Sequence, residues 1–334
     1  TLDKFALQGL QPVVATELEF YLLAPGSGDK PQPLLGEVPC LATRQEGIQY
    51  CMPDDLFDCD EFLDDVRKAC ELQSVPLTAI HSEFSPGQWE INTHHQQDPL
   101  LACDHAQLLK RIIKGVARQH GFSATFMAKP FGEMAGSGLH IHTSVYDFQG
   151  NNVFSETNGD APPAISDKLR HAVGGMSQLM AESMAIFAPN ANSYRRFSPY
   201  NFVPATPSWG PNHRGVAMRI PLSADVNRRF EFRVAGADCN AYLAVAAVLA
   251  GIHHGISGQV EPGPMTNERE EIEYNVTIPT RWPLALDAFD AGTVLSDYIG
   301  KDYHELFSSC RREEEAKFNA EIPTRDFDWY LRAV

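Results

Sequence analysis

Residues 13–23 run VVATELEFYLL, an alternation of apolar and polar side chains that predicts a β-strand. Successive side chains of a strand point to opposite faces, so Glu17 and Glu19 are expected to face the same side. The H-x-H pair of His140 and His142 has the same spacing in a second predicted strand. Two pairs of polar side chains are therefore each aimed at one cavity.

The chain holds six groups of the kind that bind divalent cations, and all six fall in segments predicted to be strands: Glu17, Glu19, Glu83, Glu90, His140 and Glu231. Buried carboxylates cannot remain unpaired, so either cations or arginines must neutralise them. The chain offers four arginines for this purpose, Arg214, Arg219, Arg229 and Arg233. Oxygen ligands beside guanidinium groups indicate a site for metal-bound phosphate. A cross-strand salt-bridge ladder in the run R-F-E-F-R at 229–233 is the simpler alternative.

Composition limits the class of protein. The 334 residues are 43% hydrophobic, enough for one large domain or two modest ones. A net charge of -16 argues against binding to nucleic acid or an anionic membrane. Seven cysteines without a C-x-x-C pair indicate reduced thiols and a cytoplasmic protein. The apolar segment 240–256 is too short to span a membrane and is predicted to be a buried core helix.

Helices and strands alternate irregularly along the chain. Strands are predicted at 13–23, 77–83, 88–93, 122–129 and 138–147, with two more within 215–234. Helices are predicted at 60–72, 98–121, 166–188 and 240–256, and the chain after them is predicted to be helical almost to its end; residues 150–163 are predicted to be a polar excursion. Strands joined mostly by hairpins, with helices in runs, favour an α+β fold with a mostly antiparallel sheet.

Six motifs occur in an order that resembles the catalytic domain of glutamine synthetases and γ-glutamyl-amine ligases: ATELEF (15–20), HSEFSPGQWEI (81–91), GSGLHIH (136–142), NSYRRF (192–197), NHRGVAMRIP (212–221) and RFEFR (229–233). The resemblance implies a catalytic domain over residues 1–334. It also implies a curved, mostly antiparallel sheet that forms an active-site funnel covered by helices.

The resemblance also implies ligands for two or three Mg²⁺ or Mn²⁺ ions. Glu19, Glu83 and Glu90 match the ligands of a first ion, and Glu17, His140 and Glu231 match those of a second. For ATP or ADP, the matching positions are His142, Ser144, Arg219 and Arg229.

Other matches concern the substrates and the chemistry. Gly136, His140, Arg196, Phe202, Arg214 and Arg233 match substrate-binding positions, and Arg214, Arg219 and Arg233 match the catalytic residues that hold the transferred phosphate. The implied reaction activates the γ-carboxyl of glutamate as a γ-glutamyl phosphate, which an amine then attacks.

Three positions depart from the family pattern. Ala135 replaces an asparagine that binds glutamate, and Val226 replaces a lysine near the nucleotide. Phe202 stands where glutamine synthetases have the glutamate that attracts ammonium. Because an aromatic ring cannot take up a proton, Phe202 favours an organic primary amine or polyamine as acceptor. A true glutamine synthetase using ammonia and a non-catalytic relative remain the alternatives.

Members of this family carry a β-grasp domain before the catalytic one, and we expect such a domain upstream of Thr1. The resemblance further implies a homo-oligomer, a double ring with active sites between subunits.

Overall fold

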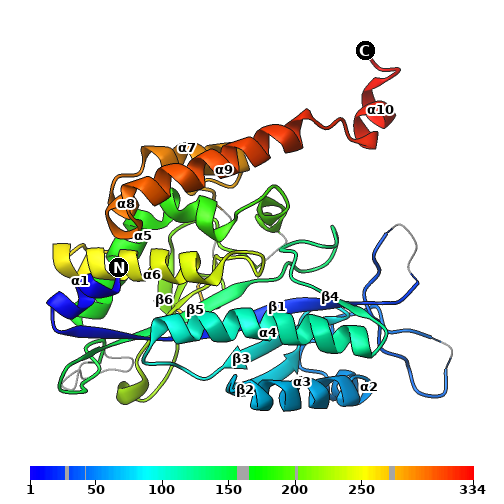
Figure 1. The fold of residues 1–334 in the computed structure, drawn as a ribbon, viewed down its shortest axis with the longest axis horizontal. Helices are drawn as coiled ribbons and strands as arrows, with labels where there is room; N and C mark the ends of the chain where they lie inside the picture. Colours follow the sequence, from blue (N-terminus) through cyan, green and yellow to red (C-terminus); the bar gives the residue numbers. More distant parts are fainter. Residues whose placement is uncertain (27–29, 42, 156–164, 200–201, 271–274) are drawn as a thin grey trace.

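The computed structural model describes residues 1–26, 30–41, 43–155, 165–199, 202–270 and 275–334. Its centre is a sheet of eight strands, in the order β2-β3-β1-β5-β8-β7-β6, with β4 paired to β1 (Figure 1). The strands are β1 (Leu10–Leu23), β2 (Leu77–Ser82), β3 (Gln88–Thr93), β4 (Ser123–Thr125), β5 (Leu139–Asp147), β6 (Trp209–Pro211), β7 (Met218–Ile220) and β8 (Phe230–Phe232).

Every strand pair is antiparallel except β6 with β7, which is parallel. The prediction of a mostly antiparallel sheet is therefore confirmed. The strand predicted over 122–129 is wrong beyond Thr125, because the backbone there leaves the sheet. The side chain of Asn192 takes over both backbone groups of Lys129, accepting from its N–H and donating to its carbonyl, each at 2.9 Å. The short strand β6 was not predicted.

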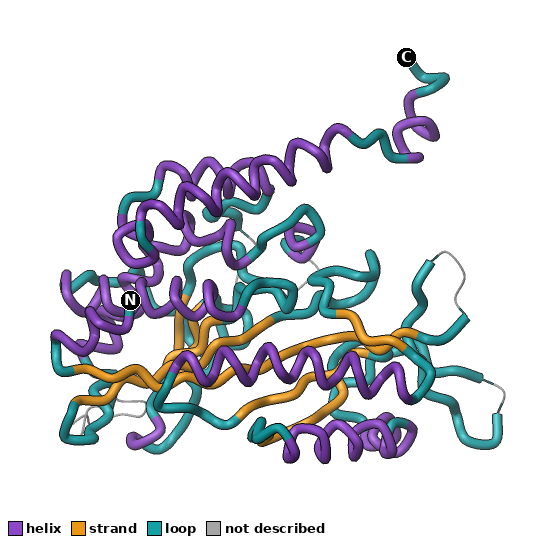
Figure 2. The backbone as a smooth tube through the Cα atoms, viewed as in Figure 1, coloured by secondary structure: helices purple, strands orange, loops and turns teal. Residues whose placement is uncertain are grey.

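Helices cover the sheet and extend beyond it (Figure 2). They are α1 (Leu2–Leu7), α2 (Pro53–Asp58), α3 (Asp60–Leu72), α4 (Pro99–Gln119), α5 (Asp167–Phe187), α6 (Ala241–Gly258), α7 (Trp282–Ala291), α8 (Val294–Ile299), α9 (Lys301–Ala320) and α10 (Thr324–Tyr330). The predicted helix at 60–72 is confirmed to the residue, and it buries Phe62, Leu63 and Val66 as its amphipathic pattern requires. Asp98 caps α4 by accepting from Leu100 N–H at 2.9 Å, with Pro99 in the first turn. Residues 156–163 of the predicted polar excursion lie outside the described residues.

Helix α6 is buried against α5, as predicted for segment 240–256. The prediction that the segment is too short to span a membrane is wrong for the helix, which continues to Gly258 and is, among the described residues, the one helix whose length and composition would let it cross a membrane. However, 61% of it is buried inside the protein. Glycines make the close packing of α5 and α6 possible. A Cβ on Gly175 would approach the backbone of Gly251 and Gly255 more closely than real Cβ atoms do.

Gly175→Ala is therefore expected to lower the free energy of unfolding by about 3 kcal/mol, because backbone atoms on the opposite helix cannot move aside. Urea unfolding measures the change. Gly115→Ala on α4 is the matched control, since a Cβ there meets no atom within 4 Å. That variant should be stabilised by about 0.5–1 kcal/mol. Equal stabilities for the two variants would contradict the close packing of α5 and α6.

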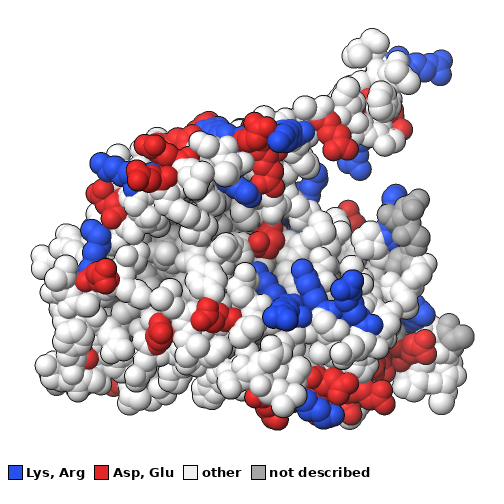
Figure 3. All heavy atoms as spheres, viewed as in Figure 1, with Lys and Arg blue, Asp and Glu red and all other residues white. Residues whose placement is uncertain are grey.

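The view in Figure 3 shows how charge is distributed over one face. Basic side chains gather over α4, which carries Lys110, Arg111, Lys114 and Arg118, whereas acidic and basic side chains alternate over α9. Residues 321–334, here named the C-terminal arm, project away from the body with α10 (Figure 1). Its apolar side chains are open to solvent: Trp329 is 59% exposed and Leu331 is 76% exposed.

Candidate active site

The register of the sheet places the predicted ligands side by side across five strands. Glu19 lies opposite Glu90 between β1 and β3, and Glu17 lies opposite His140 between β1 and β5. One strand further, His142 lies opposite Glu231. Glu83 follows the end of β2 by one residue. Side chains directly opposite one another in a sheet interact, so this register converts scattered acidic residues into one continuous polar row.

Most of the predicted site residues line one cavity of about 610 Å³. These are Glu17, Glu19, Glu83, Glu90, Gly136, His140, Arg196, Phe202, Arg214, Arg219 and Arg233. The position that departs from the family pattern at Ala135 lines the same cavity. Carboxylates from β1 and β3 thus share a cavity with four arginines from later in the chain.

Three of the predicted nucleotide residues, His142, Ser144 and Arg229, line a second cavity of about 480 Å³. The fourth, Arg219, lines the first cavity instead. Arg229 Nε donates to His142 Nδ1 at 3.2 Å, and the Ser144 hydroxyl donates to the backbone carbonyl of Arg228 at 3.0 Å. The two cavities share Glu17 and Asn92 in their walls. The two cavities therefore adjoin at Glu17 and Asn92.

Glu231 lies behind this meeting point with no exposed surface. Its two carboxylate oxygens form ion pairs with Arg219 and Arg233. Burial opposes ionisation of Glu231, but His142, Arg233 and Arg219 outweigh it and lower the pKa to about 2. The salt-bridge interpretation of the R-F-E-F-R run is thus correct for Glu231. The pairing also holds both arginines at the cavity wall.

Two imidazoles lie against the carboxylate of Glu17. His142 Nε2 lies 2.8 Å from one of its oxygens, and His140 Nδ1 lies 3.0 Å from the other. Burial opposes ionisation here as well, yet the two histidines hold the pKa of Glu17 far below its ordinary value. Glu17 is therefore a carboxylate at every physiological pH.

Glu19 and Glu90 have weaker partners. Burial raises the pKa of Glu19, and burial together with the charges of Glu17, Glu19 and Glu83 raises the pKa of Glu90 well above its ordinary value. The nearest basic group to Glu90 is His81, whose Nε2 lies 3.4 Å from it. Glu19 and Glu90 lie opposite each other, and two ionised carboxylates at these positions would repel. This part of the row therefore has more negative charge than the neighbouring basic groups compensate.

That deficit and the donor set fit divalent cations. Ligand atoms within 4.8 Å of one another occur in three groups: Glu17 with His142 and Glu231, Glu17 with Glu90 and His140, and His81 with Glu83 and Glu90. Carboxylate oxygens with an occasional imidazole suit Mg²⁺ or Mn²⁺. These groups differ from the two predicted ligand sets. Glu83 and Glu90 are grouped with His81 where Glu19 was expected, and Glu17 and Glu231 are grouped with His142 where His140 was expected.

The glycines of the G-S-G turn make room for Arg196. A Cβ on Gly136 would lie 2.7 Å from Arg196 Cγ, and one on Gly138 would lie 3.0 Å from Arg196 Nη2. Arg196 itself is 2% exposed and donates to the carbonyl of Val234 at 2.9 Å. The guanidinium is thus held in place by packing at the cavity wall.

Several residues of the first cavity were not predicted. His81 precedes Glu83 by two positions, so the alternation applied to Glu17 and Glu19 could have found it. Tyr50 accepts a hydrogen bond from Arg214 Nη1 at 3.0 Å and comes from a long loop that carries no sequence signal. Phe84 packs edge-to-face on Phe202, with ring centroids 5.5 Å apart. Only the fold brings Tyr50 to the site, whereas Phe84 directly follows the predicted ligand Glu83 in the sequence.

The raised pKa of Glu90 predicts a pH-dependent stability. In protein stripped of divalent ions, Glu90→Gln should raise the free energy of unfolding at pH 8 by about 1–3 kcal/mol, since it removes a poorly compensated buried charge. The folded protein binds this proton more tightly than the unfolded chain, so stability is lost as pH rises above the ordinary carboxyl pKa. The gain should therefore vanish below about pH 4.

Thermal unfolding in EDTA between pH 4 and pH 8 measures this gain. Glu305→Gln, at an exposed position of α9, is the control and should change little at any pH. A gain that is independent of pH would contradict the raised pKa.

A row of carboxylates, two neighbouring cavities and a set of arginines gather at the mostly antiparallel sheet, which is the arrangement of an enzyme active site. The chain belongs to the glutamine synthetase family, because the family model described as "Glutamine synthetase, catalytic domain" matches residues 1–330. The resemblance drawn from the six motifs is confirmed.

Two relatives and one solved structure illustrate the similarity. "Gamma-glutamylputrescine synthetase PuuA" of Escherichia coli (strain K12) is 40% identical over 336 residues, which cover 97% of this chain and 68% of the relative. "Glutamine synthetase" of Halobacterium salinarum is 31% identical over 304 residues, 89% of this chain and 66% of the relative. The chain thus spans about two thirds of the length of both. The structure "Apo GmaS without ligand" superposes with a TM-score of 0.85 at 26% identity, covering 99% of this chain and 75% of that one.

Proposed function

We propose that this protein is an ATP-dependent ligase that joins the γ-carboxyl of glutamate to an organic primary amine. The observation that carries the proposal is the meeting of two cavities at Glu17, one lined by the predicted nucleotide residues and the other by arginines and an aromatic pair. Family membership and the 40% identity to a γ-glutamylputrescine synthetase support it.

In this proposal, a γ-carboxyl oxygen of glutamate attacks the terminal phosphorus of ATP, and ADP leaves. Arg214, Arg219 and Arg233 line the cavity where this charge would develop, and they stabilise the phosphoryl group during its transfer. Divalent ions held by Glu17, Glu19, Glu83, Glu90, His140 and Glu231 would neutralise the phosphates. Arg196 holds glutamate itself.

The nitrogen of the neutral amine then attacks the activated carbonyl carbon, phosphate leaves with the oxygen that came from glutamate, and the nitrogen gives up one proton, for which the departing phosphate is the acceptor. The acceptor end of the cavity favours an alkyl group, because Phe202 stands where glutamine synthetases have a carboxylate, and Phe84 packs against it and extends the apolar surface. An alkylammonium ion can place its methylenes against these rings, which ammonium cannot do.

A comparison of acceptors tests the proposal. With glutamate, ATP and Mg²⁺ or Mn²⁺, kcat/KM for putrescine, n-butylamine and ethanolamine should each exceed that for ammonia by at least about tenfold, the value of one or two buried methylenes. Faster turnover with ammonia would favour a glutamine synthetase instead. If calorimetry detected no metal-dependent ATP binding, a non-catalytic relative would be favoured.

We also propose that the protein acts as a homo-oligomer in the cytoplasm. The C-terminal arm supports assembly, since Ile322, Phe327, Trp329 and Leu331 are each more than half exposed in the single chain. A second copy of the chain is the partner that would cover them, as expected for a member of this family. Sedimentation of the protein with and without residues 321–334 measures whether the arm holds the assembly together.

A further inference from the structure

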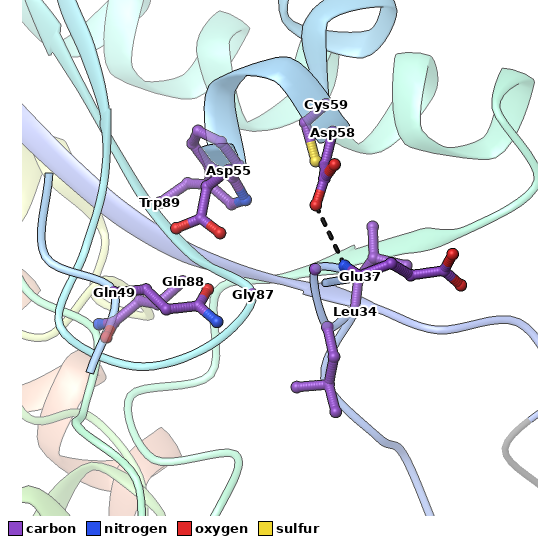
Figure 4. Close-up of a pocket in the computed structure, with 11 residues that line it drawn as sticks. Leu34, Glu37, Gln49, Asp55, Asp58, Cys59, Gly87, Gln88 and Trp89 are labelled. Carbon is purple, nitrogen blue, oxygen red and sulfur yellow. Dashed lines mark hydrogen bonds between the residues drawn. The ribbon is translucent and has the colours of Figure 1, made fainter. Parts of the chain in front are cut away.

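A separate cavity of about 260 Å³ lies between α2 with the following Cys59, the loop at 34–37, and the start of β3 with the turn before it. Figure 4 shows Asp55 and Asp58 of α2 on one side of it, with Gln49, Gly87 and Trp89 around them. None of the predicted active-site residues lines this cavity. Apart from Gln88, which reaches both, its walls are distinct from those of the first cavity.

The cavity is acidic and lacks a basic residue. Its walls carry three carboxylates, Glu37, Asp55 and Asp58, and contain no lysine, arginine or histidine among the described residues. Asp58 Oδ2 accepts a hydrogen bond from Glu37 N–H at 3.2 Å (Figure 4). The backbone thus satisfies Asp58 in part.

Asp55 is not satisfied in this way. It is only 9% exposed, and within the described part of the chain its Oδ2 atom is buried without a hydrogen-bond partner. Burial, with the nearby charges of Asp58 and Asp54, raises its pKa, and the Ser82 hydroxyl offsets the rise only in part. A buried carboxylate oxygen without a donor requires a positive or hydrogen-bonding partner.

The residues that line the cavity indicate which kind of partner could bind the Asp55 carboxylate. The three groups of described residues that could hold a metal ion include neither Asp55 nor Asp58, so a divalent ion is not the best match. Leu34, Leu35 and Trp89 supply apolar surface beside the carboxylates, and the volume exceeds that of one small ion. A charged head with a short apolar chain matches both features.

We propose that this cavity binds a small primary alkylammonium ion, with its head on Asp55 and its chain against Trp89. The assignment rests on the walls of the cavity and is independent of the proposed function.

An occupant would contact the hairpin that carries the metal ligands. Gly87, in the turn between β2 and β3, and Gln88, the first residue of β3, both line the cavity. The turn is closely packed: Gly87 has φ +72°, and a Cβ there would lie 2.7 Å from the carbonyl oxygen of Leu34. Gln88 Nε2 in turn donates to the carbonyl of Gly136 at 3.0 Å, across the first cavity. A bound amine would therefore influence the position of the hairpin that carries Glu83 and Glu90.

Fluorine NMR of the full chain labelled with 5-fluorotryptophan tests the proposal, with the n-butylammonium ion as the probe. Trp89 is the one tryptophan in the walls of this cavity, and the walls of the first cavity contain none, so the Trp89 signal reports directly on this site, and the Asp55→Asn variant separates it from amine bound in the first cavity. Trp89→Phe assigns the signal. The Trp89 signal should shift saturably with n-butylammonium but not with an equal concentration of potassium.

Asp55→Asn should raise the apparent Kd at least tenfold, whereas Asp54→Asn, at an exposed position on the same helix, should leave it unchanged. Circular dichroism checks that both variants fold. A Trp89 signal that does not move, that moves equally with potassium, or that moves equally in the Asp55→Asn protein would overturn the proposal. None of these outcomes bears on ligase turnover, which is measured separately.

Discussion

Glu90→Gln is expected to reduce ligase turnover by about a thousandfold, the effect of losing several kcal/mol of metal-assisted charge stabilisation. Glu90 belongs to two of the three groups of side chains that could hold an ion, so one substitution weakens both. Its carboxylate is 5% exposed, and water cannot replace it easily. Steady-state turnover with saturating glutamate and amine, over a range of Mn²⁺ concentrations, measures the loss.

The same variant is expected to be more stable than the parent in EDTA at pH 8, as argued from the raised pKa of Glu90. A variant that is more stable but less active indicates that the Glu90 carboxylate serves function at a cost in stability. Glu305→Gln controls for the loss of one carboxylate from the surface and should retain full turnover. Turnover within threefold of the parent would show that Glu90 does not hold a catalytic ion.

Phe202→Glu is expected to reverse the preference for acceptors. It restores the carboxylate that attracts ammonium in glutamine synthetases and removes the ring that packs on Phe84. We expect kcat/KM for ammonia to rise about tenfold and that for n-butylamine to fall about tenfold, each shift being worth about 1.4 kcal/mol. Because Phe202 is 71% exposed, the change should cost little stability.

Phe148→Glu is the matched control, since Phe148 is also exposed, at 65%, and lies outside the walls of both cavities of the active site. It should leave both acceptors unaffected. If Phe202→Glu lowered kcat/KM for ammonia and n-butylamine by the same factor, Phe202 would have a general role in the site and no role in selecting the acceptor.

The sequence predicted the parts of the site that depend on alternation within a strand. Glu17 and Glu19 face one side because β1 is regular over 14 residues, and H-x-H in β5 behaves in the same way. The order of the strands brings these residues beside Glu90 and Glu231, and that order could be predicted only through the family resemblance.

Other parts of the site depend on loops and irregular pairing. Tyr50 reaches Arg214 from a position 164 residues away in the sequence, and nothing in the residues around it signals the contact. The parallel pair β6 and β7 consists of three-residue strands, and Gly210 and Pro211 hide any periodicity. The salt bridges of Glu231 were foreseen only as an alternative to metal binding, whereas in the structure Glu231 pairs with two arginines and also belongs to a group that could hold a metal ion.

The transfer of oxygen from glutamate to phosphate tests the central claim most directly. Glutamate labelled with ¹⁸O in its γ-carboxyl group is incubated with ATP, Mg²⁺ or Mn²⁺, and putrescine, and the released phosphate is analysed by mass spectrometry. The account predicts one ¹⁸O atom in each phosphate, because the carboxyl oxygen that attacks ATP leaves with the phosphoryl group. Amide formation with unlabelled phosphate would contradict it.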